Sequence, residues 1–372
     1  MKKTQFSSRF AGTRNFIKIF AACVAASLFN AISLQAATVT WTGGGADNNW
    51  LDAANWSSNP SLPVTGTGTS GDQLQLDTTA NYAIYAAAEG ALTYQSIRVG
   101  VTANGRLDVT GGTLTADGST QGRVGVGFAG TENIAGGTLK IGGDEQIGLN
   151  TGGVGIVNVS SGTLDVTRGT TEDGVANDSI SLGAGGTATG TLNLSGGNVY
   201  TRFGVEVGQS SLAGSGTFNV MGGGIANIGT DNGVNLTSAG FWLQKGNGTL
   251  AATVNSTGFT LGQINILNGT AAPQYVSFEA GSTLSLGFSG AAPTSTMSWN
   301  LMTFSDTDSL TNNLTLAAGD AAAGWSFGIV DNSGTDDLQV TYTVAAVPEP
   351  SVLSLLGAGI AGLGLVMRRC QS

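Results

Sequence analysis

The sequence predicts an all-β fold, namely a right-handed parallel β-solenoid (β-helix), and three observations support this prediction. Glycine accounts for 60 of the 372 residues, more than twice its usual share of roughly 7%. Apolar and polar residues alternate in short runs, which is typical of strands. One pattern recurs about every 25 residues, a period typical of coils that stack on one another.

The repeat unit combines a strand-like run, a glycine corner, a second strand and a further glycine step. Its second half occurs as RLDVTGGTL (106–114), NIAGGTL (133–139), VNVSSGTL (157–164), LNLSGGNV (192–199) and FNVMGGGI (218–225). Its reference glycines are Gly112, Gly137, Gly162, Gly197 and Gly223, so the intervals are 25, 25, 35 and 26 residues. Its first half ends at Gly100, Gly127, Gly148, Gly183 and Gly208. The long interval contains RGTTEDGVAND (168–178), which we expect to be a surface loop inserted into one rung.

The alternation assigns each strand an inner and an outer face. Val159 and Leu194 belong to the apolar set that we expect to point into the coil. The polar residues between the apolar ones should point to water, and at equivalent positions they should form a ladder of amide hydrogen bonds. These residues are Asp108, Asn158, Asn193 and Asn219. The glycine steps should be corners with positive φ or close backbone approach.

A β-sandwich, or two of them, is the alternative architecture for the same short strands. Sandwiches do not require regular repetition of one unit, whereas a solenoid does. The five marked repeats therefore favour the solenoid. We assign residues 90–250 to it.

Residues 1–36 have the pattern of a secretory signal peptide that forms a helix. Lys2, Lys3, Arg9, Arg14 and Lys18 precede the apolar run IFAACVAASLFNAISL. Small residues follow, and we expect cleavage after Ala36. A retained amphipathic anchor is the alternative.

Residues 37–89 form the predicted N-terminal cap region. Trp41, Trp50 and Trp56 lie close together in it. They suit an end cap, in which bulky rings cover the open core of the first rung, because solenoids need such caps for solubility. They also suit a carbohydrate platform, since indole faces stack on sugar rings, and the sequence leaves both interpretations open.

Residues 251–346 should hold irregular rungs and a C-terminal β cap. LNGT (267–270) and AGSTLSL (280–286) resemble looser repeats. LQVTYTV (338–344) alternates regularly and is the predicted last strand.

Residues 347–372 form a distinct tail. Pro348 and Pro350 should keep its start extended. The apolar run 352–367 is predicted to be a transmembrane helix, but 16 residues reach only about 24 Å against a hydrocarbon core of roughly 30 Å. Arg368 and Arg369 follow it and favour the cytoplasmic side. The tail is therefore a marginal anchor, suited to transient membrane insertion.

Charge and cysteine content restrict the partners of the exported body. Seven of the 14 basic residues lie in the two terminal segments, so seven remain against nearly all 24 acidic residues. An acidic body argues against nucleic acid or anionic lipid as partners. Cys23 and Cys370 both lie in the terminal segments, which leaves the body without a disulfide.

The residue types present argue against an enzyme. The chain has no histidine, which removes imidazole bases, histidine-containing triads and histidine metal sites. Paired carboxylates remain, since β-helical polysaccharide hydrolases and lyases use them. The candidates are Asp144-Glu145, Glu172-Asp173 and Asp336-Asp337. We expect all three to be solvated charges in loops, and we expect no cofactor or metal.

The tail resembles the sorting domain of PEP-CTERM proteins. The resemblance rests on Val347, Pro348, Glu349, Pro350 and Ser351, the apolar run, and the pair Arg368 and Arg369, together with the N-terminal signal. It implies recognition by an exosortase, a membrane transpeptidase-like enzyme, on envelopes of bacteria that also make exopolysaccharide. Cys370-Gln371-Ser372 departs from the family, whose members commonly end close to the basic cluster.

The GGTL repeats of residues 90–250 also resemble the passenger-associated repeats of autotransporter-like exported β-helices. Together these features predict an exported structural or adhesive protein of the cell envelope, outer surface or extracellular matrix, with exopolysaccharide as a further partner. The alternative is a β-helical protein that binds or degrades polysaccharide.

Overall fold

The structure is a computed structural model of the whole chain. It describes residues 36–67, 70–118, 122–167, 179–208, 213–231, 234–235, 240–243, 247–267, 275–305, 309–332 and 334–345. The predicted signal peptide, the insert 168–178 and the tail from residue 347 lie outside the described residues.

The described strands form three long sheets. Sheet A contains β1 (Thr38–Trp41), β2 (Gln73–Leu76), β5 (Ser96–Val99), β8 (Gly122–Val126), β11 (Glu145–Leu149), β14 (Ser179–Leu182), β17 (Gly204–Val207), β22 (Gly240–Leu243), β25 (Tyr275–Phe278) and β28 (Ser309–Asn312). Sheet B contains β3 (Ala83–Tyr85), β6 (Gly105–Val109), β9 (Ala129–Ile134), β12 (Val154–Val159), β15 (Thr189–Leu194), β18 (Ser215–Met221), β23 (Gly248–Val254), β26 (Thr283–Phe288) and β29 (Thr315–Leu316). Sheet C contains β4 (Ala91–Tyr94), β7 (Thr113–Ala116), β10 (Thr138–Ile141), β13 (Thr163–Val166), β16 (Asn198–Thr201), β19 (Ile225–Ile228), β24 (Gln263–Ile266), β27 (Met297–Ser305), β31 (Thr335–Tyr342) and β30 (Trp325–Asp331).

Smaller elements lie outside these sheets. They are the short pair β20 (Thr230–Asp231) and β21 (Val234–Asn235), and the 3-10 helices η1 (Ala53–Asn55) and η2 (Ala87–Glu89). Among the residues that the structure describes, no helix is both long enough and apolar enough to cross a membrane.

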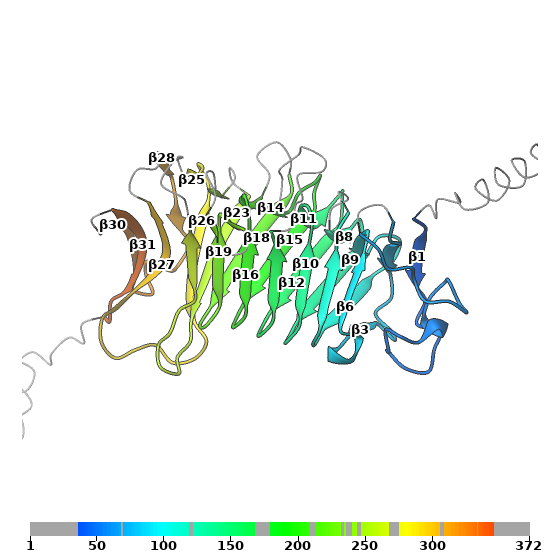
Figure 1. Cartoon of the computed structure of the whole chain (residues 1–372). Helices are drawn as coiled ribbons and strands as arrows, with labels where there is room; N and C mark the ends of the chain where they lie inside the picture. Colours follow the sequence, from blue (N-terminus) through cyan, green and yellow to red (C-terminus); the bar gives the residue numbers. More distant parts are fainter. Residues whose placement is uncertain are drawn as a thin grey trace, which may run out of the picture.

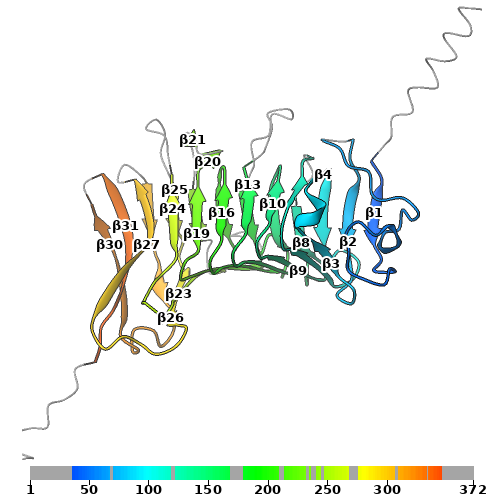
Figure 2. The ribbon, with the colours of Figure 1, turned by 60° about the horizontal axis from the view of Figure 1, so that its bottom comes forward.

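The chain visits sheets A, B and C in turn, so each coil supplies one strand to each sheet. In the rung formed by β11, β12 and β13, every strand pairs in parallel with its counterpart in the rungs before and after it. Figures 1 and 2 show the rungs following one another along a single axis. This is the predicted parallel β-solenoid. The sandwich alternative is wrong, because successive coils pair in parallel and each sheet is assembled from successive coils.

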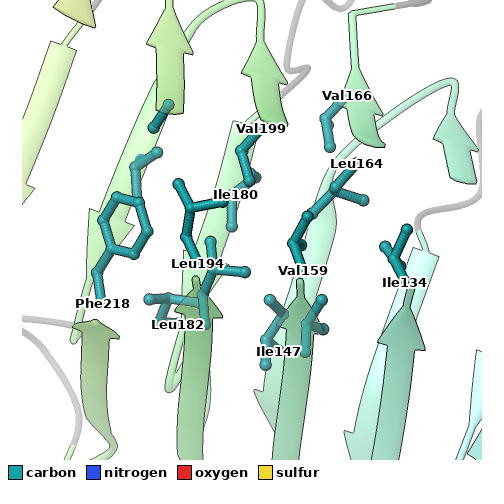
Figure 3. Packing of buried hydrophobic residues seen from close by; sticks show 14 of the residues in the cluster. Ile134, Ile147, Val159, Leu164, Val166, Ile180, Leu182, Leu194, Val199 and Phe218 are labelled. Carbon is teal, nitrogen blue, oxygen red and sulfur yellow. The ribbon is translucent and has the colours of Figure 1, made fainter. Parts of the chain in front are cut away.

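Side chains from all three sheets meet in one continuous core. Val159 and Leu194, which the alternation assigned to the inside, are both 0% exposed. Figure 3 shows Ile180, Leu194 and Val199, one from each sheet of a single rung, pointing toward one another. A single rung could not cover these residues, so each coil is stabilised by the coils stacked on either side of it.

The corner between sheets A and B depends on two stacks of glycine. Gly148 has a φ of 74°, a conformation that L residues with a Cβ rarely adopt. The sheet B strand of the same rung carries Gly155, and a Cβ there would clash with the amide nitrogen of Gly148. In the preceding rung, on strand β8, the equivalent of Gly148 is Gly125, because Ile147 pairs with Val124. The sequence pattern had placed that corner two residues later, at Gly127, whose φ is also positive at 95°.

The stack begins before residue 90, within the predicted cap region, and it continues after residue 250, where irregular rungs were expected. A complete three-strand rung exists already at β2, β3 and β4, and further rungs continue through β26 and β27. At the C-terminal end β31 pairs antiparallel with both β27 and β30. The antiparallel strands end the parallel ladder of sheet C, and β31 confirms the predicted strand near residues 338–344.

Candidate functional site

The three N-terminal tryptophans lie inside the first rungs. Trp41, Trp50 and Trp56 are 1%, 0% and 1% exposed, and Trp56 makes edge-to-face contacts with the other two rings at centroid distances of 4.9 Å. Their indole N–H groups donate to the Asn81 carbonyl, the Tyr94 hydroxyl and the Trp50 carbonyl at 2.7, 3.1 and 2.9 Å. This arrangement fits an end cap, and in this structure no indole face of the three is open to a sugar.

The pair Asp336-Asp337 was expected in a solvated loop, but it lies in strand β31. Asp337 is 4% exposed. Its carboxylate accepts hydrogen bonds from Asn300 Nδ2 and Thr303 Oγ1, each at 2.6 Å, and from Asn332 Nδ2. These bonds tie β27 to β31 and leave Asp337 as a structural group of the C-terminal cap.

The pair Asp144-Glu145 also differs from the expected solvated loop. Asp144 is partly buried and accepts a hydrogen bond from the Ser179 amide at 3.2 Å. Glu145 is the first residue of β11 and is 0% exposed. The third pair, Glu172-Asp173, lies outside the described residues.

Glu145 shares the core with a second acidic residue that the sequence patterns did not single out, Glu132 on β9. Glu132 is 1% exposed and lies in register between Leu107 and Val157. It therefore occupies a column of sheet B that is apolar in the neighbouring rungs. Glu145 lies in register between Gly122 and Ile180 of sheet A.

The position of the Glu145 carboxyl depends on Gly122, its register partner on β8. A Cβ at Gly122 would fall on Glu145 Oε2, so the carboxyl fills the space that a side chain at this position would take. Within the described residues, neither Glu145 oxygen has a hydrogen-bond partner, and neither does Glu132 Oε2. Buried polar groups without partners destabilise a fold by about 1–3 kcal/mol each.

Burial governs the protonation of this internal carboxyl pair, defined as Glu132 and Glu145. Desolvation raises the pKa of Glu132 to about 8. Desolvation also raises the pKa of Glu145 well above its usual range, and the charges of Glu132 and Asp144 raise it further. At neutral pH Glu132 is therefore largely protonated, and burial favours the protonated form of Glu145 in the same way. A carboxyl closed off from solvent in this way does not reach a substrate, so the pair influences how the stability of the fold depends on pH.

The outer face of sheet B confirms the predicted polar ladder. Asn158 Nδ2 donates to Asn133 Oδ1 at 2.8 Å, and Asn193 Nδ2 donates to Asn158 Oδ1 at 2.8 Å. Asn219 continues the ladder at 3.3 Å, and Asn133 ends it on Asp108 Oδ1 at 2.6 Å. All the amides donate in one direction, toward a carboxylate, and such aligned chains polarise one another favourably.

A basic side chain completes that ladder at its acidic end. Arg106 Nε and Nη2 donate to the two Asp108 oxygens at 2.8 and 2.7 Å. The side chain also lies over the Tyr82 ring, at 3.9 Å from its centroid. The ladder is thus neutralised at its end and is internally bonded, which suits a structural role.

The outer face of sheet A differs, because its outward side chains vary from rung to rung. Register places seven of them in one row. In order along the axis they are Gln75, Arg98, Arg123, Gln146, Ser181, Glu206 and Trp242. We call this row the sheet A stripe. Sequence patterns did not reveal it, since its members have no common type and only the strand register aligns them.

Among the described residues, no group of three His, Cys, Asp or Glu side chains is placed to hold a metal ion. No protein-family model, no curated protein and no solved structure matches the chain. Function is therefore inferred from the residues of this chain.

Proposed function

We propose that the protein is an exported structural or adhesive component of the cell envelope, outer surface or extracellular matrix, sorted by its C-terminal tail. The observation that carries the structural part is the continuous solenoid. Parallel rungs pair on both sides, from β2 to the antiparallel strands β30 and β31. Unpaired strand edges invite association with other chains. Here the Trp41, Trp50 and Trp56 cluster fills the first rungs, and the antiparallel strands β31 and β30 end sheet C.

The body suits an extracellular setting because its stability comes from packing and hydrogen bonds. Buried aliphatic columns, the asparagine ladder and the glycine corners hold it together without a disulfide. We infer a right-handed coil, since about 98% of parallel β-crossovers have that hand.

The sorting part rests on the sequence of the tail. Pro348-Glu349-Pro350 would present an extended recognition site outside the membrane, and the run 352–367 would insert transiently as a short helix. Arg368 and Arg369 would hold its orientation. The proposed partner is an exosortase-like membrane enzyme, which would release the body to the surface or matrix, where exopolysaccharide is the further proposed partner.

Cell fractionation tests the sorting proposal. Pro348, Glu349 and Pro350 are changed together to alanine, and mass spectrometry identifies the protein's termini in each fraction. We expect export to continue while the full-length chain accumulates in the membrane. A variant that is released and processed like the wild type contradicts sorting by this motif. Changing Ser354 to alanine, inside the apolar run, is the matched control and should leave processing unchanged.

A further inference from the structure

One tryptophan lies on the outside of the solenoid, on strand β22. Phe241 and Leu243 on either side of Trp242 point into the core and are 0% exposed. Trp242 therefore points outward, and its side chain is partly exposed. It lies in register with Glu206 on the neighbouring strand β17.

The Trp242 ring packs on two glycines. Gly240 and Gly204 are in register with each other and occupy outward positions, yet both are buried. A Cβ on Gly240 would clash with ring atoms Cζ2 and Cη2 and lie 2.9 Å from Cε2. A Cβ on Gly204 would clash with Cζ3 and lie 3.1 Å from Cη2. The indole thus lies over bare backbone of two adjacent strands.

The surroundings of this ring are polar. The sheet A stripe continues from Trp242 through Glu206, Ser181 and Gln146 to Arg123 and Arg98. A protein partner that docks on an aromatic anchor usually finds an apolar patch around it, and this row offers hydroxyl, amide and charged groups instead. An aromatic face combined with hydrogen-bonding groups suits a sugar polymer.

Two arginines face outward side by side next to Gln75, toward the N-terminal end of the stripe. Arg98 and Arg123 are register partners, so they form a local basic site on a body whose overall charge is acidic. Burial and the charge of Arg98 both lower the pKa of Arg123. An anionic ligand group would offset this like-charge repulsion, and guanidinium groups bind carboxylates through paired hydrogen bonds.

We propose that the sheet A stripe binds an acidic polysaccharide along the solenoid axis. Trp242 stacks on a sugar ring, Glu206, Ser181 and Gln146 meet the hydroxyl groups, and Arg98 and Arg123 hold a carboxylate. Trp242 and Arg123 are four strands apart, about 19 Å at the usual spacing, so the ligand is a chain of several sugars. This inference rests on the proposed adhesive role and gives it a ligand class.

Calorimetric titration of the full-length chain in mild detergent tests the proposal, with polygalacturonate as the acidic polymer and dextran as the neutral one. We expect saturable binding of polygalacturonate that weakens with salt, and at least tenfold weaker binding of dextran. Trp242→Ala should weaken polygalacturonate binding at least tenfold, and Arg98→Gln by a similar factor. Lys140→Gln removes a cation from the outer face of sheet C and should leave the affinity unchanged.

A glycine variant separates ring position from folding. Gly240→Ala keeps every polar group and has the Trp242 ring as its three nearest contacts, so it should displace the ring and weaken binding while the chain stays folded by circular dichroism. Wild-type affinity in Trp242→Ala and Gly240→Ala, or no binding of polygalacturonate at all, overturns the proposal. Equal affinity for dextran overturns the acidic assignment.

The tail variant distinguishes this proposal from sorting. The chain with Pro348, Glu349 and Pro350 changed to alanine should bind polygalacturonate like the wild type. A chain that is sorted but does not bind rejects the binding site alone, and one that binds but is processed independently of the motif rejects sorting alone.

Discussion

Asn193 donates a hydrogen bond from its side-chain amide to the side-chain oxygen of Asn158 at 2.8 Å, although the two residues are 35 positions apart. The neighbouring residues, Val159 and Leu194, are fully buried on the opposite face. Sheet B thus carries a polar column on the face toward water and an apolar column on the face toward the core.

The first prediction tests this separation. Val159→Asp places a charge in the core, and we expect a loss of about 4 kcal/mol or more in the free energy of unfolding. Asn158→Asp changes the adjacent outward residue, still accepts from Asn193 and should cost only about 1 kcal/mol. Urea unfolding followed by circular dichroism measures both. Equal losses in the two variants would contradict the assignment of faces.

The second prediction concerns the glycine corners. Gly148 has a φ of 74°, and a Cβ there would lie 2.5 Å from the Thr189 carbonyl carbon. Gly152 has a φ of 82°, with nothing within 4 Å of its Cβ position. Gly152→Ala should therefore lower the free energy of unfolding by about 1–2 kcal/mol, the strain of a left-handed backbone. Gly148→Ala should lower it by at least about 3 kcal/mol, because the next rung must also shift. Similar losses in urea unfolding would mean that close stacking does not require Gly148.

The repeating part of the fold could be predicted from the sequence because its determinants are local. The positive φ of Gly148 requires a glycine, and the alternation of Asn158 with Val159 requires a polar residue beside an apolar one. Both requirements recur in each copy of the repeat. The N-terminal start of the stack could not be predicted, because the rung of β2, β3 and β4 lacks the GGTL step. Their place follows only from register with neighbours that do carry it.

The chemistry of the exterior was harder to predict for the same reason. Trp41, Trp50 and Trp56 are conspicuous in the sequence, yet they are buried, while the single Trp242 faces outward. Glu132 escaped notice because it immediately precedes the NIAGGTL motif, although the 25-residue interval aligns it with the inward Leu107 and Val157. The asparagine ladder could be predicted because one residue type recurs in it, whereas the mixed row of sheet A depends on register between strands far apart in the chain.

The third prediction concerns catalysis. The full-length chain should release neither reducing ends nor unsaturated products from polygalacturonate, dextran or other bacterial and plant polysaccharides. Asp337 is engaged by three donors and Glu145 lies in the core, so neither is placed as an acid or base for a bound glycan. Reproducible turnover that is lost in Asp144→Asn, Glu172→Gln or Asp337→Asn would establish an enzyme instead.

The fourth prediction follows from the internal carboxyl pair. The pKa of Glu132 is raised to about 8, above the roughly 4.3 of an unfolded chain, so the folded state binds the extra proton between these values. Its contribution to stability is fully present below about pH 4 and is lost as the pH rises through about 8. The raised pKa of Glu145 acts in the same direction.

We therefore expect the wild type to unfold at lower urea concentration at pH 9 than at pH 5, whereas Glu132→Gln, which is neutral at every pH, should lose much of that difference. Asp165→Asn, on the outer face of sheet C beside Lys140, is the control that should keep it. An unchanged pH dependence in Glu132→Gln would mean that the pair does not titrate in the folded protein.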